Sequence, residues 1–91
     1  MGKEQILFKS EQKMSSAEAA QILRTIADKV ERGKVVLTQG AKKTTLKIPG
    51  QVELELKAEK ETGRRKTNKK LEIEIEWVVG AAGHEEKVKI K

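Results

Sequence analysis

Residues 15–33, SSAEAAQILRTIADKVERG, decide the fold because they predict its helix. Ser15 and Glu18 have the spacing of a capping box, in which each side chain accepts a hydrogen bond from the other residue's backbone N–H. The apolar residues after them recur at steps of three and one and fall on one side of a helix: Ala19, Ile22, Leu23, Ile26, Ala27 and Val30. Gly33 supplies the left-handed residue that commonly ends a helix. We therefore expect an amphipathic helix over residues 16–32.

After Gly33 the apolar period changes to two, which is typical of half-buried antiparallel strands. Four stretches alternate in this way: residues 35–37, 46–48, 52–56 and 71–77. Before the helix, Ile6 and Phe8 alternate within a further short strand over about residues 4–10. These elements predict a two-layer α+β domain, in which the helix packs on one antiparallel sheet of about five strands, in the order β-α-β-β-β-β.

The register of the strands follows from keeping their apolar residues on one face, because a slip of one residue turns a strand over. A four-residue loop at 40–43, a three-residue loop at 49–51 and a tip centred on 64–65 satisfy this condition. The facing pairs are then Leu37–Leu46 and Val35–Ile48, Ile48–Val52 and Leu46–Leu54, and Leu56–Ile73, Leu54–Ile75 and Val52–Trp77. The first strand pairs antiparallel with the strand ending at Trp77 or parallel with the strand starting at Val35, and we favour the former.

The chain is expected to form one domain over residues 1–78, followed by a flexible or weakly ordered tail over residues 79–91. Residues 80–83, GAAG, form a flexible link by composition. Residues 86–91 alternate weakly, so that they form either an edge strand or a disordered end.

Three groups of residues carry a family likeness: ILFKSE at 6–11, SSAEAAQILRTIADKVERG at 15–33, and the alternating strands that end at Trp77. On these residues the chain resembles the amphi-Trp domain, a small prokaryotic family named for an amphipathic strand that bears a tryptophan. The likeness spans about residues 4–77. The resemblance implies this fold, and it brings no catalytic residue, because the family is uncharacterised.

The composition narrows the classes of function. The chain has 91 residues, of which 36% are hydrophobic and 37% charged, a net charge of +6, no Cys and one His. No apolar run approaches the ~18 residues of a membrane span, and the first residues lack the pattern of a secretory signal. The absence of Cys excludes disulfides, thiol catalysis and Cys-based zinc sites. We therefore expect a cytoplasmic protein with no membrane contact, no cofactor, no metal and no small-molecule substrate.

Most of the positive charge belongs to residues 60–70, KETGRRKTNKK, which hold six basic side chains and one acidic side chain. The basic residues are Lys60, Arg64, Arg65, Lys66, Lys69 and Lys70. A basic hairpin can bind phosphates of a polyanion in a salt-dependent manner. The aromatic residues Phe8 and Trp77 are both assigned to the core, so no platform for stacking bases is predicted. The favoured interpretation is a solvated turn that keeps the hairpin from aggregating, and nucleic-acid binding is the alternative.

A cluster of carboxylates is predicted on the outer face of the sheet: Glu53, Glu55, Glu72, Glu74 and Glu76. Such a cluster can bind a divalent cation or act as an acid–base pair. The register instead sets Lys47 opposite Glu53, Thr45 opposite Glu55 and Lys57 opposite Glu72, and leaves Glu55–Glu74 and Glu53–Glu76 as like-charged pairs. We expect a solvated face of mixed charge, with a cation or a basic partner as the alternative.

No nucleophile–base pair, metal cluster or phosphate-binding loop can be assembled from these residues, so we do not expect an enzyme. The leading hypothesis is a small cytoplasmic binding or adaptor module that acts through protein–protein contact or a homodimer, by a strand edge or a sheet face. Its partner surface would contain Trp77, if partly exposed, with Glu53, Glu55, Glu74 and Glu76. The alternative is a nucleic-acid accessory protein that uses the basic hairpin 60–70.

Overall fold

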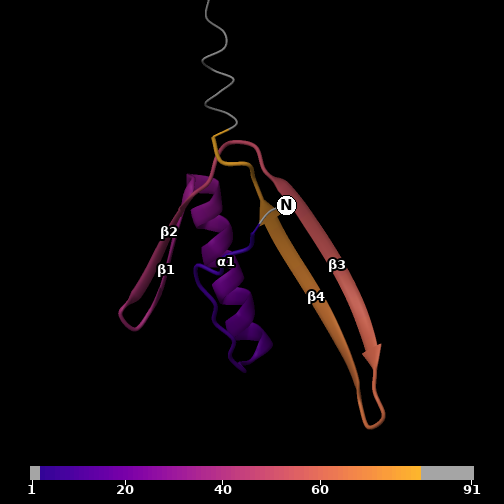
Figure 1. Ribbon diagram of the computed structural model, residues 1–91. Coiled ribbons are helices and arrows are strands. Elements are labelled where there is room, and N and C mark those ends of the chain that lie inside the picture. The colour runs from indigo at the N-terminus through magenta and orange to yellow at the C-terminus, as the bar shows by residue number, and fades with distance from the viewer. Residues whose placement is uncertain (1–2, 81–91) are drawn as a thin grey trace, which may run out of the picture. The chain divides into compact units, whose positions relative to one another are not determined.

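The computed structural model describes residues 3–80 of the chain. Its elements are α1 (Ser16–Arg32), β1 (Lys34–Gln39), β2 (Lys42–Lys47), β3 (Glu53–Thr62) and β4 (Thr67–Glu76) (Figure 1). The chain divides into two compact units, of which the first ends at Gly50 and the second begins at Gln51. The α+β class is confirmed, since one helix is combined with two antiparallel two-stranded sheets.

Helix α1 has the bounds and the caps that the sequence predicts. The Ser15 hydroxyl accepts a hydrogen bond from the Glu18 N–H at 3.0 Å, and the Glu18 carboxylate accepts one from the Ser15 N–H at 3.1 Å. At the other end Gly33 has a φ of +90°, and its N–H donates to the Val30 carbonyl at 3.0 Å. Both ends of the helix therefore have partners for otherwise free backbone groups.

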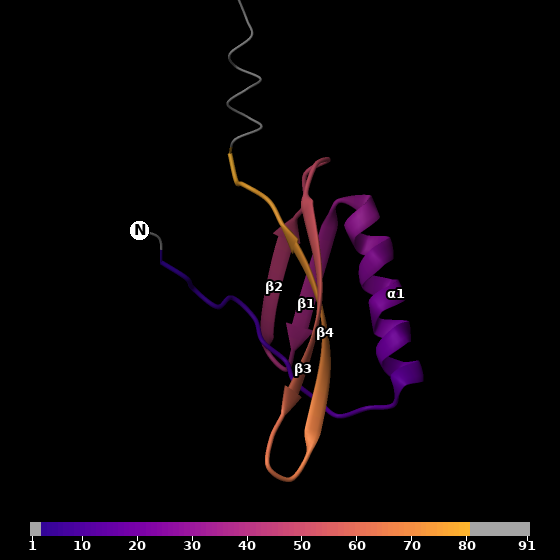
Figure 2. The same ribbon diagram turned by 90° about the vertical axis from the view of Figure 1, so that its right-hand side faces the viewer.

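In the first unit, α1 packs against the β1–β2 hairpin, and the two form separate layers (Figure 2). Val35 on β1 is 6% exposed and is the one buried apolar residue among residues 3–80. In the same unit, Ile26 and Val30 of α1 and Leu37 and Leu46 of the hairpin are half-buried, and Leu46 faces Val35. The core of this unit is therefore small and centred on Val35.

The β1–β2 register differs from the predicted one by two residues. Val35 faces Leu46 and Leu37 faces Thr44, where the four-residue loop had set Leu37 opposite Leu46. The strands are joined by two residues, Gly40 and Ala41, and Gly40 has a φ of +59°, as a two-residue hairpin turn with glycine in first place requires. A shift of two leaves every side chain on its predicted face.

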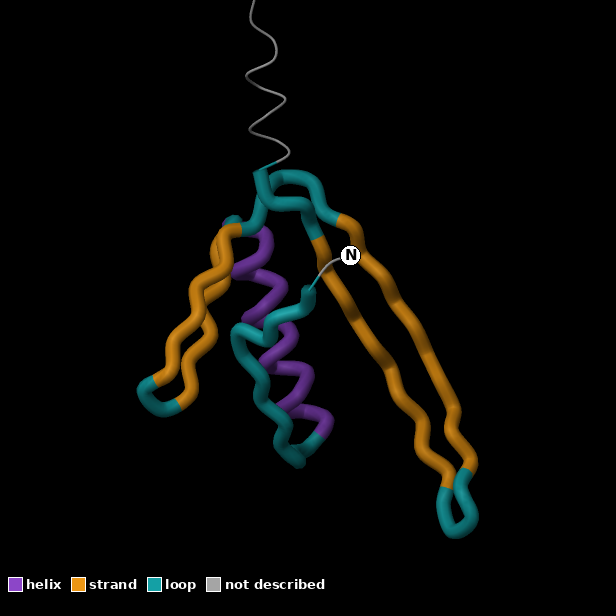
Figure 3. The backbone as a smooth tube through the Cα atoms, in the orientation of Figure 1, coloured by secondary structure: helices purple, strands orange, loops and turns teal. Residues whose placement is uncertain are grey.

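The predicted first strand over residues 4–10 is wrong. Residues 3–15 contain neither helix nor strand, as the loop colour of this segment in Figure 3 shows. The Thr44 hydroxyl donates to the Leu7 carbonyl at 3.1 Å, which is a side-chain contact and not a sheet ladder. Ile6 is 72% exposed and Phe8 is half-buried, so these two alternating residues do not form the buried side of a strand.

The second unit consists of the β3–β4 hairpin, and its register is confirmed. Leu54 faces Ile75, Leu56 faces Ile73, and Lys57 faces Glu72. At the tip the Gly63 N–H donates to the Lys66 carbonyl at 2.8 Å.

The single five-stranded sheet is wrong, because the described residues form two sheets, β1-β2 and β3-β4. The predicted pairs between β2 and β3, Ile48–Val52 and Leu46–Leu54, are absent from residues 3–80. Pro49 has no N–H to donate to a ladder. The Ile48 N–H instead donates to the Gly33 carbonyl at 2.9 Å, which extends the pairing of the first hairpin.

Residues 81–91, the greater part of the predicted tail, lie outside the described residues. Within the described part of the chain, no helix combines the length and the apolar character needed to cross a membrane.

Candidate interaction surface

The β3–β4 hairpin has one apolar side, which we call the apolar face: Leu54, Leu56, Leu71, Ile73, Ile75 and Trp77. The register places the first five of these residues together because side chains alternate along both strands, and Trp77 directly follows the end of β4. Four of these side chains are exposed, from 47% for Ile73 to 70% for Leu71. Ile75 and Trp77 are half-buried. Over residues 51–80 the second unit contains no further helix or strand to cover the apolar face.

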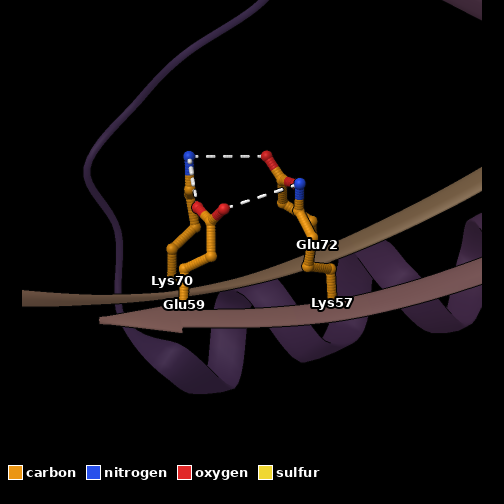
Figure 4. Close-up of polar contacts among 4 residues, drawn as sticks. All are labelled: Lys57, Glu59, Lys70 and Glu72. Carbon is orange, nitrogen blue, oxygen red and sulfur yellow. Dashed lines mark ion pairs between the residues drawn. The ribbon is translucent and has the colours of Figure 1, made fainter. Parts of the chain in front are cut away.

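The opposite side of the hairpin has four charged residues at its middle, which we call the ion-pair quartet: Lys57, Glu59, Lys70 and Glu72 (Figure 4). The Lys57 ammonium lies 3.5 Å from the Glu59 carboxylate and 3.7 Å from that of Glu72. The Lys70 ammonium lies 3.5 Å from Glu59 and 3.4 Å from Glu72. Each charge therefore has two partners of opposite sign.

These contacts shift the pKa of three members of the quartet, Lys57, Glu59 and Lys70. The charge of Lys57, and then that of Lys70, lowers the pKa of Glu59 below its ordinary value. The pKa of Lys70 is raised chiefly by the charge of Glu72, and that of Lys57 chiefly by the charge of Glu59. All four side chains are about half exposed, so the ion pairs are of the solvated kind that adds little to stability.

Near the base of the hairpin the same side has only carboxylates, which we call the acidic end: Glu53, Glu55, Glu74 and Glu76. Glu53 faces Glu76 and Glu55 faces Glu74, as the register predicts. The pKa of Glu74 is raised, chiefly by the charge of Glu55 directly opposite. The predicted pairings of Glu53 with Lys47 and of Glu55 with Thr45 are wrong, because β2 and β3 belong to different sheets. No ion pair of residues 3–80 includes a member of the acidic end.

The acidic end does not have the arrangement of a metal site. Among the residues that the structure describes, no group of three or more His, Cys, Asp or Glu side chains is placed to hold a metal ion. The carboxylates lie in a row along an exposed pair of strands, where water screens their charges.

The six predicted basic residues are distributed over three parts of the hairpin. Lys70 belongs to the ion-pair quartet on the polar side. Lys60 and Lys69 face each other on the opposite side, where they continue the apolar face toward the tip. Arg64, Arg65 and Lys66 lie in the connection between β3 and β4. The structure therefore does not gather the six into one patch.

The first unit has an open groove of about 1020 Å³ that the sequence did not predict. The N-terminal segment, α1 and β1 line it, with Phe8, Ile22, Leu23 and Leu37 among the apolar residues. The apolar period of α1 predicts Ile22 and Leu23 as members of a covered core and not as the lining of a groove. Ile22 and Leu23 are each 47% exposed.

Comparisons with curated proteins and with solved structures gave no match. The model of the amphi-Trp domain matches residues 1–91. This match includes residues 78–91, which the resemblance seen in the sequence did not cover. The chain therefore belongs to the amphi-Trp domain family over its whole length.

Proposed function

We propose that the chain is a small, cytoplasmic, non-catalytic binding module that acts through protein–protein contact, self-association included, by its β3–β4 hairpin. The observation that supports this function most directly is the exposed apolar face. Four of its large side chains keep about half or more of their surface exposed to water. A contiguous apolar surface of this kind is unfavourable in water and marks a site of association.

The charges beside the apolar face support the same function. The acidic end has four carboxylates without an ion-pair partner among residues 3–80, and the pKa of Glu74 is raised chiefly by repulsion from the charge of Glu55. A partner with basic or amide side chains would relieve this repulsion, and a charged rim around an apolar centre gives an interface its specificity.

The non-catalytic part of the proposal is supported by the roles of the polar groups. The Ser15 hydroxyl is engaged in the cap of α1. The carboxylates of the hairpin lie on a surface that is exposed to water, whereas acid–base chemistry requires a site that excludes it. The cytoplasmic location is supported by the absence of Cys, which fits a reducing compartment.

Sedimentation of the purified chain tests the proposed self-association. We expect a species larger than a monomer at micromolar to millimolar concentration, and we expect the exchange of Leu56 and Ile73 for Ser to remove it. The matched control exchanges Glu61 for Ser, because this residue lies on the polar side of β3, outside the ion-pair quartet and the acidic end. Equal loss in both variants would contradict a role of the apolar face.

Polyanion binding by residues 60–70 is the second candidate. Its support is that five of the six basic residues make no ion pair among residues 3–80, Lys70 being the sixth. We expect retention on heparin that falls steeply with salt and is lost when Arg64, Arg65 and Lys66 are exchanged for Glu. Absence of binding to DNA and RNA at low salt would contradict this function.

A further inference from the structure

Strand β4 is divided into a basic half and an acidic half. Lys69 and Lys70 lie on the side of the tip, Glu72, Glu74 and Glu76 lie on the side of the base, and Leu71 lies between them. One edge of β4 pairs with β3, and over residues 3–80 the other edge pairs with no strand. A free edge presents a row of backbone N–H and C=O groups, which a further strand can pair with.

A second copy of β4 complements this strand when it runs antiparallel about a two-fold axis at Leu71. Three unlike pairs then form on the polar side, each of them twice. Lys70 comes opposite Glu72 of the second copy and Asn68 opposite Glu74, and the residue opposite Glu76 is Lys66, which directly precedes β4. The acidic end, which has no ion-pair partner within residues 3–80, thereby receives one amide and one ammonium group from the other copy.

The same register connects the two ion-pair quartets. Lys57 faces Glu72 within one copy, Glu72 faces Lys70 of the second copy, and that Lys70 faces its own Glu59. Charges of opposite sign therefore alternate across four strands, and the two-fold axis repeats this row. Opposite charges directly across a pair of strands stabilise the pairing, whereas like charges destabilise it.

The register also keeps the apolar faces of both copies on one side. Leu71 meets Leu71 of the second copy, and Lys69 lies opposite Ile73. A two-fold axis at Leu71 sets odd-numbered residues of one copy opposite odd-numbered residues of the other. Because the apolar side chains of β4 are at odd positions, they lie on the same side of the sheet in both copies. The result is one continuous apolar face over four strands.

The free edge of β3 does not offer this complementarity. On its polar side it has four carboxylates and one ammonium group: Glu53, Glu55, Lys57, Glu59 and Glu61. Every antiparallel self-pairing of β3 that keeps the apolar faces together therefore sets at least one carboxylate opposite another. Strands β1 and β2 have basic residues and no acidic ones, so neither complements itself.

We propose that two copies of the chain join antiparallel along the free edge of β4, about a two-fold axis at Leu71, to form a four-stranded sheet in the order β3-β4-β4-β3. This inference rests on the proposed function, of which it identifies the partner, the edge and the register. The polar pairs are exposed, so the association weakens as the salt concentration rises.

Disulfide formation tests the edge, because the chain has no Cys of its own. In the proposed sheet the two Leu71 Cα atoms lie about 4.5–5.5 Å apart, which a disulfide can bridge. Ala58 is the matched control. It lies directly opposite Leu71 on the same side of the hairpin, but it is three strand spacings, about 14 Å, from its counterpart. We expect Leu71→Cys to cross-link under mild oxidation and Ala58→Cys to remain monomeric. If two copies instead associated by stacking their apolar faces, Leu71→Cys and Ala58→Cys would cross-link equally. Equal cross-linking would therefore overturn the proposal.

Charge exchange tests the register. Lys66→Glu and Glu76→Lys each set like charges opposite one another twice in the dimer, so each variant alone should associate about tenfold more weakly. A mixture of the two restores both unlike pairs, and the mixed dimer should form in preference to either pure one. Glu76→Lys also removes the repulsion with Glu53, so this variant is expected to fold.

The outcomes separate this inference from the function on which it rests. Self-association that persists without preferential cross-linking at Leu71, or without preference for the mixed dimer, overturns the β4 edge and leaves the proposed function standing. A strict monomer at millimolar concentration overturns the edge and self-association together. Cross-linking at Leu71 combined with a preferred mixed dimer establishes both.

Discussion

The two hairpins of this chain have similar apolar alternation but different surroundings. In the first unit α1 packs against β1, and Val35 is 6% exposed. The β3–β4 hairpin has longer strands and more regular alternation, yet none of its residues is buried. Alternation therefore specifies that a strand has an apolar side, and it does not specify what covers that side. The proposed function and the proposed dimer both follow from this difference.

Removal of one methyl-bearing side chain from each hairpin is the most direct test of the comparison. We expect Val35→Ala to lower the free energy of unfolding by about 2 kcal/mol, because it leaves a cavity beside α1. Leu56→Ala should cost less than about 0.5 kcal/mol in the monomer, because Leu56 is already 65% exposed. Urea denaturation at low protein concentration measures both values. Equal losses would show that the apolar face is covered in the folded monomer.

The junction between α1 and β1 offers a second test of the difference between the two hairpins, because it directs α1 against the β1–β2 hairpin. Gly33 has a φ of +90°, which strains a residue with a Cβ atom, although the nearest atom to that Cβ would be the Ile48 carbonyl oxygen at 3.4 Å. We expect Gly33→Ala to cost about 1 kcal/mol through this backbone strain. Gly50→Ala is the matched control, since Gly50 has no positive φ and nothing lies within 4 Å of the added Cβ. Urea denaturation that shows equal effects would contradict the backbone explanation.

Removal of the N-terminal cap of α1 should lower the stability by a similar or slightly smaller amount than Gly33→Ala. Ser15→Ala removes the acceptor for the Glu18 N–H and should lower the stability of the first unit by about 1 kcal/mol. Ser16→Ala is the control, because Ser16 is the first residue of the helix and the capping bonds belong to Ser15 and Glu18. Thermal unfolding followed by circular dichroism measures the difference. A melting temperature lowered as much by Ser16→Ala would exclude the capping box as the cause.

The sequence predicted those features that depend on neighbours along the chain or on one tight hairpin. The caps of α1 at Ser15 and Gly33 need only local hydrogen bonds, and they were correct to the residue. The β3–β4 register was also correct, because a tip centred on residues 64–65 sets Leu54 opposite Ile75 and Leu56 opposite Ile73. The β1–β2 register was wrong by two, since loops of two and of four residues preserve the same faces.

The remaining errors concern pairing between segments without a tight turn. The alternation of residues 52–56 fits a five-stranded sheet as well as it fits an isolated hairpin, so it could not exclude the pairing of β2 with β3. The acidic end was predicted by the register, but its neutralisation by Lys47 depended on that absent pairing. The charge division of β4 was visible in the sequence as a basic segment followed by LEIEIEW. To relate this charge division to pairing between two copies, it was necessary to know which edge of β4 is free.

The smallest predicted effect concerns the two ends of the polar side of the β3–β4 hairpin, which should respond to pH in opposite directions. Lys57 lowers the pKa of Glu59, so Glu59 stabilises the fold above its ordinary pKa of 4.5, and this contribution is lost as the pH falls through the lowered value. Glu55 raises the pKa of Glu74, whose contribution is present below the ordinary value and is lost as the pH rises through the raised one.

At pH 7 we therefore expect Glu59→Gln to lower the urea midpoint slightly and Glu74→Gln to raise it slightly. Both differences should vanish at about pH 2, where the carboxylates are protonated in the folded and the unfolded chain. Glu61→Gln is the control, because the residue across from Glu61 is the neutral Asn68. Shifts of the same sign in the first two variants would contradict the division of this side into an ion-pair quartet and a repulsive acidic end. Because the acidic end is then the less stable half of the hairpin in a single chain, it is also the half that gains most from the Lys66 and Asn68 of a second copy.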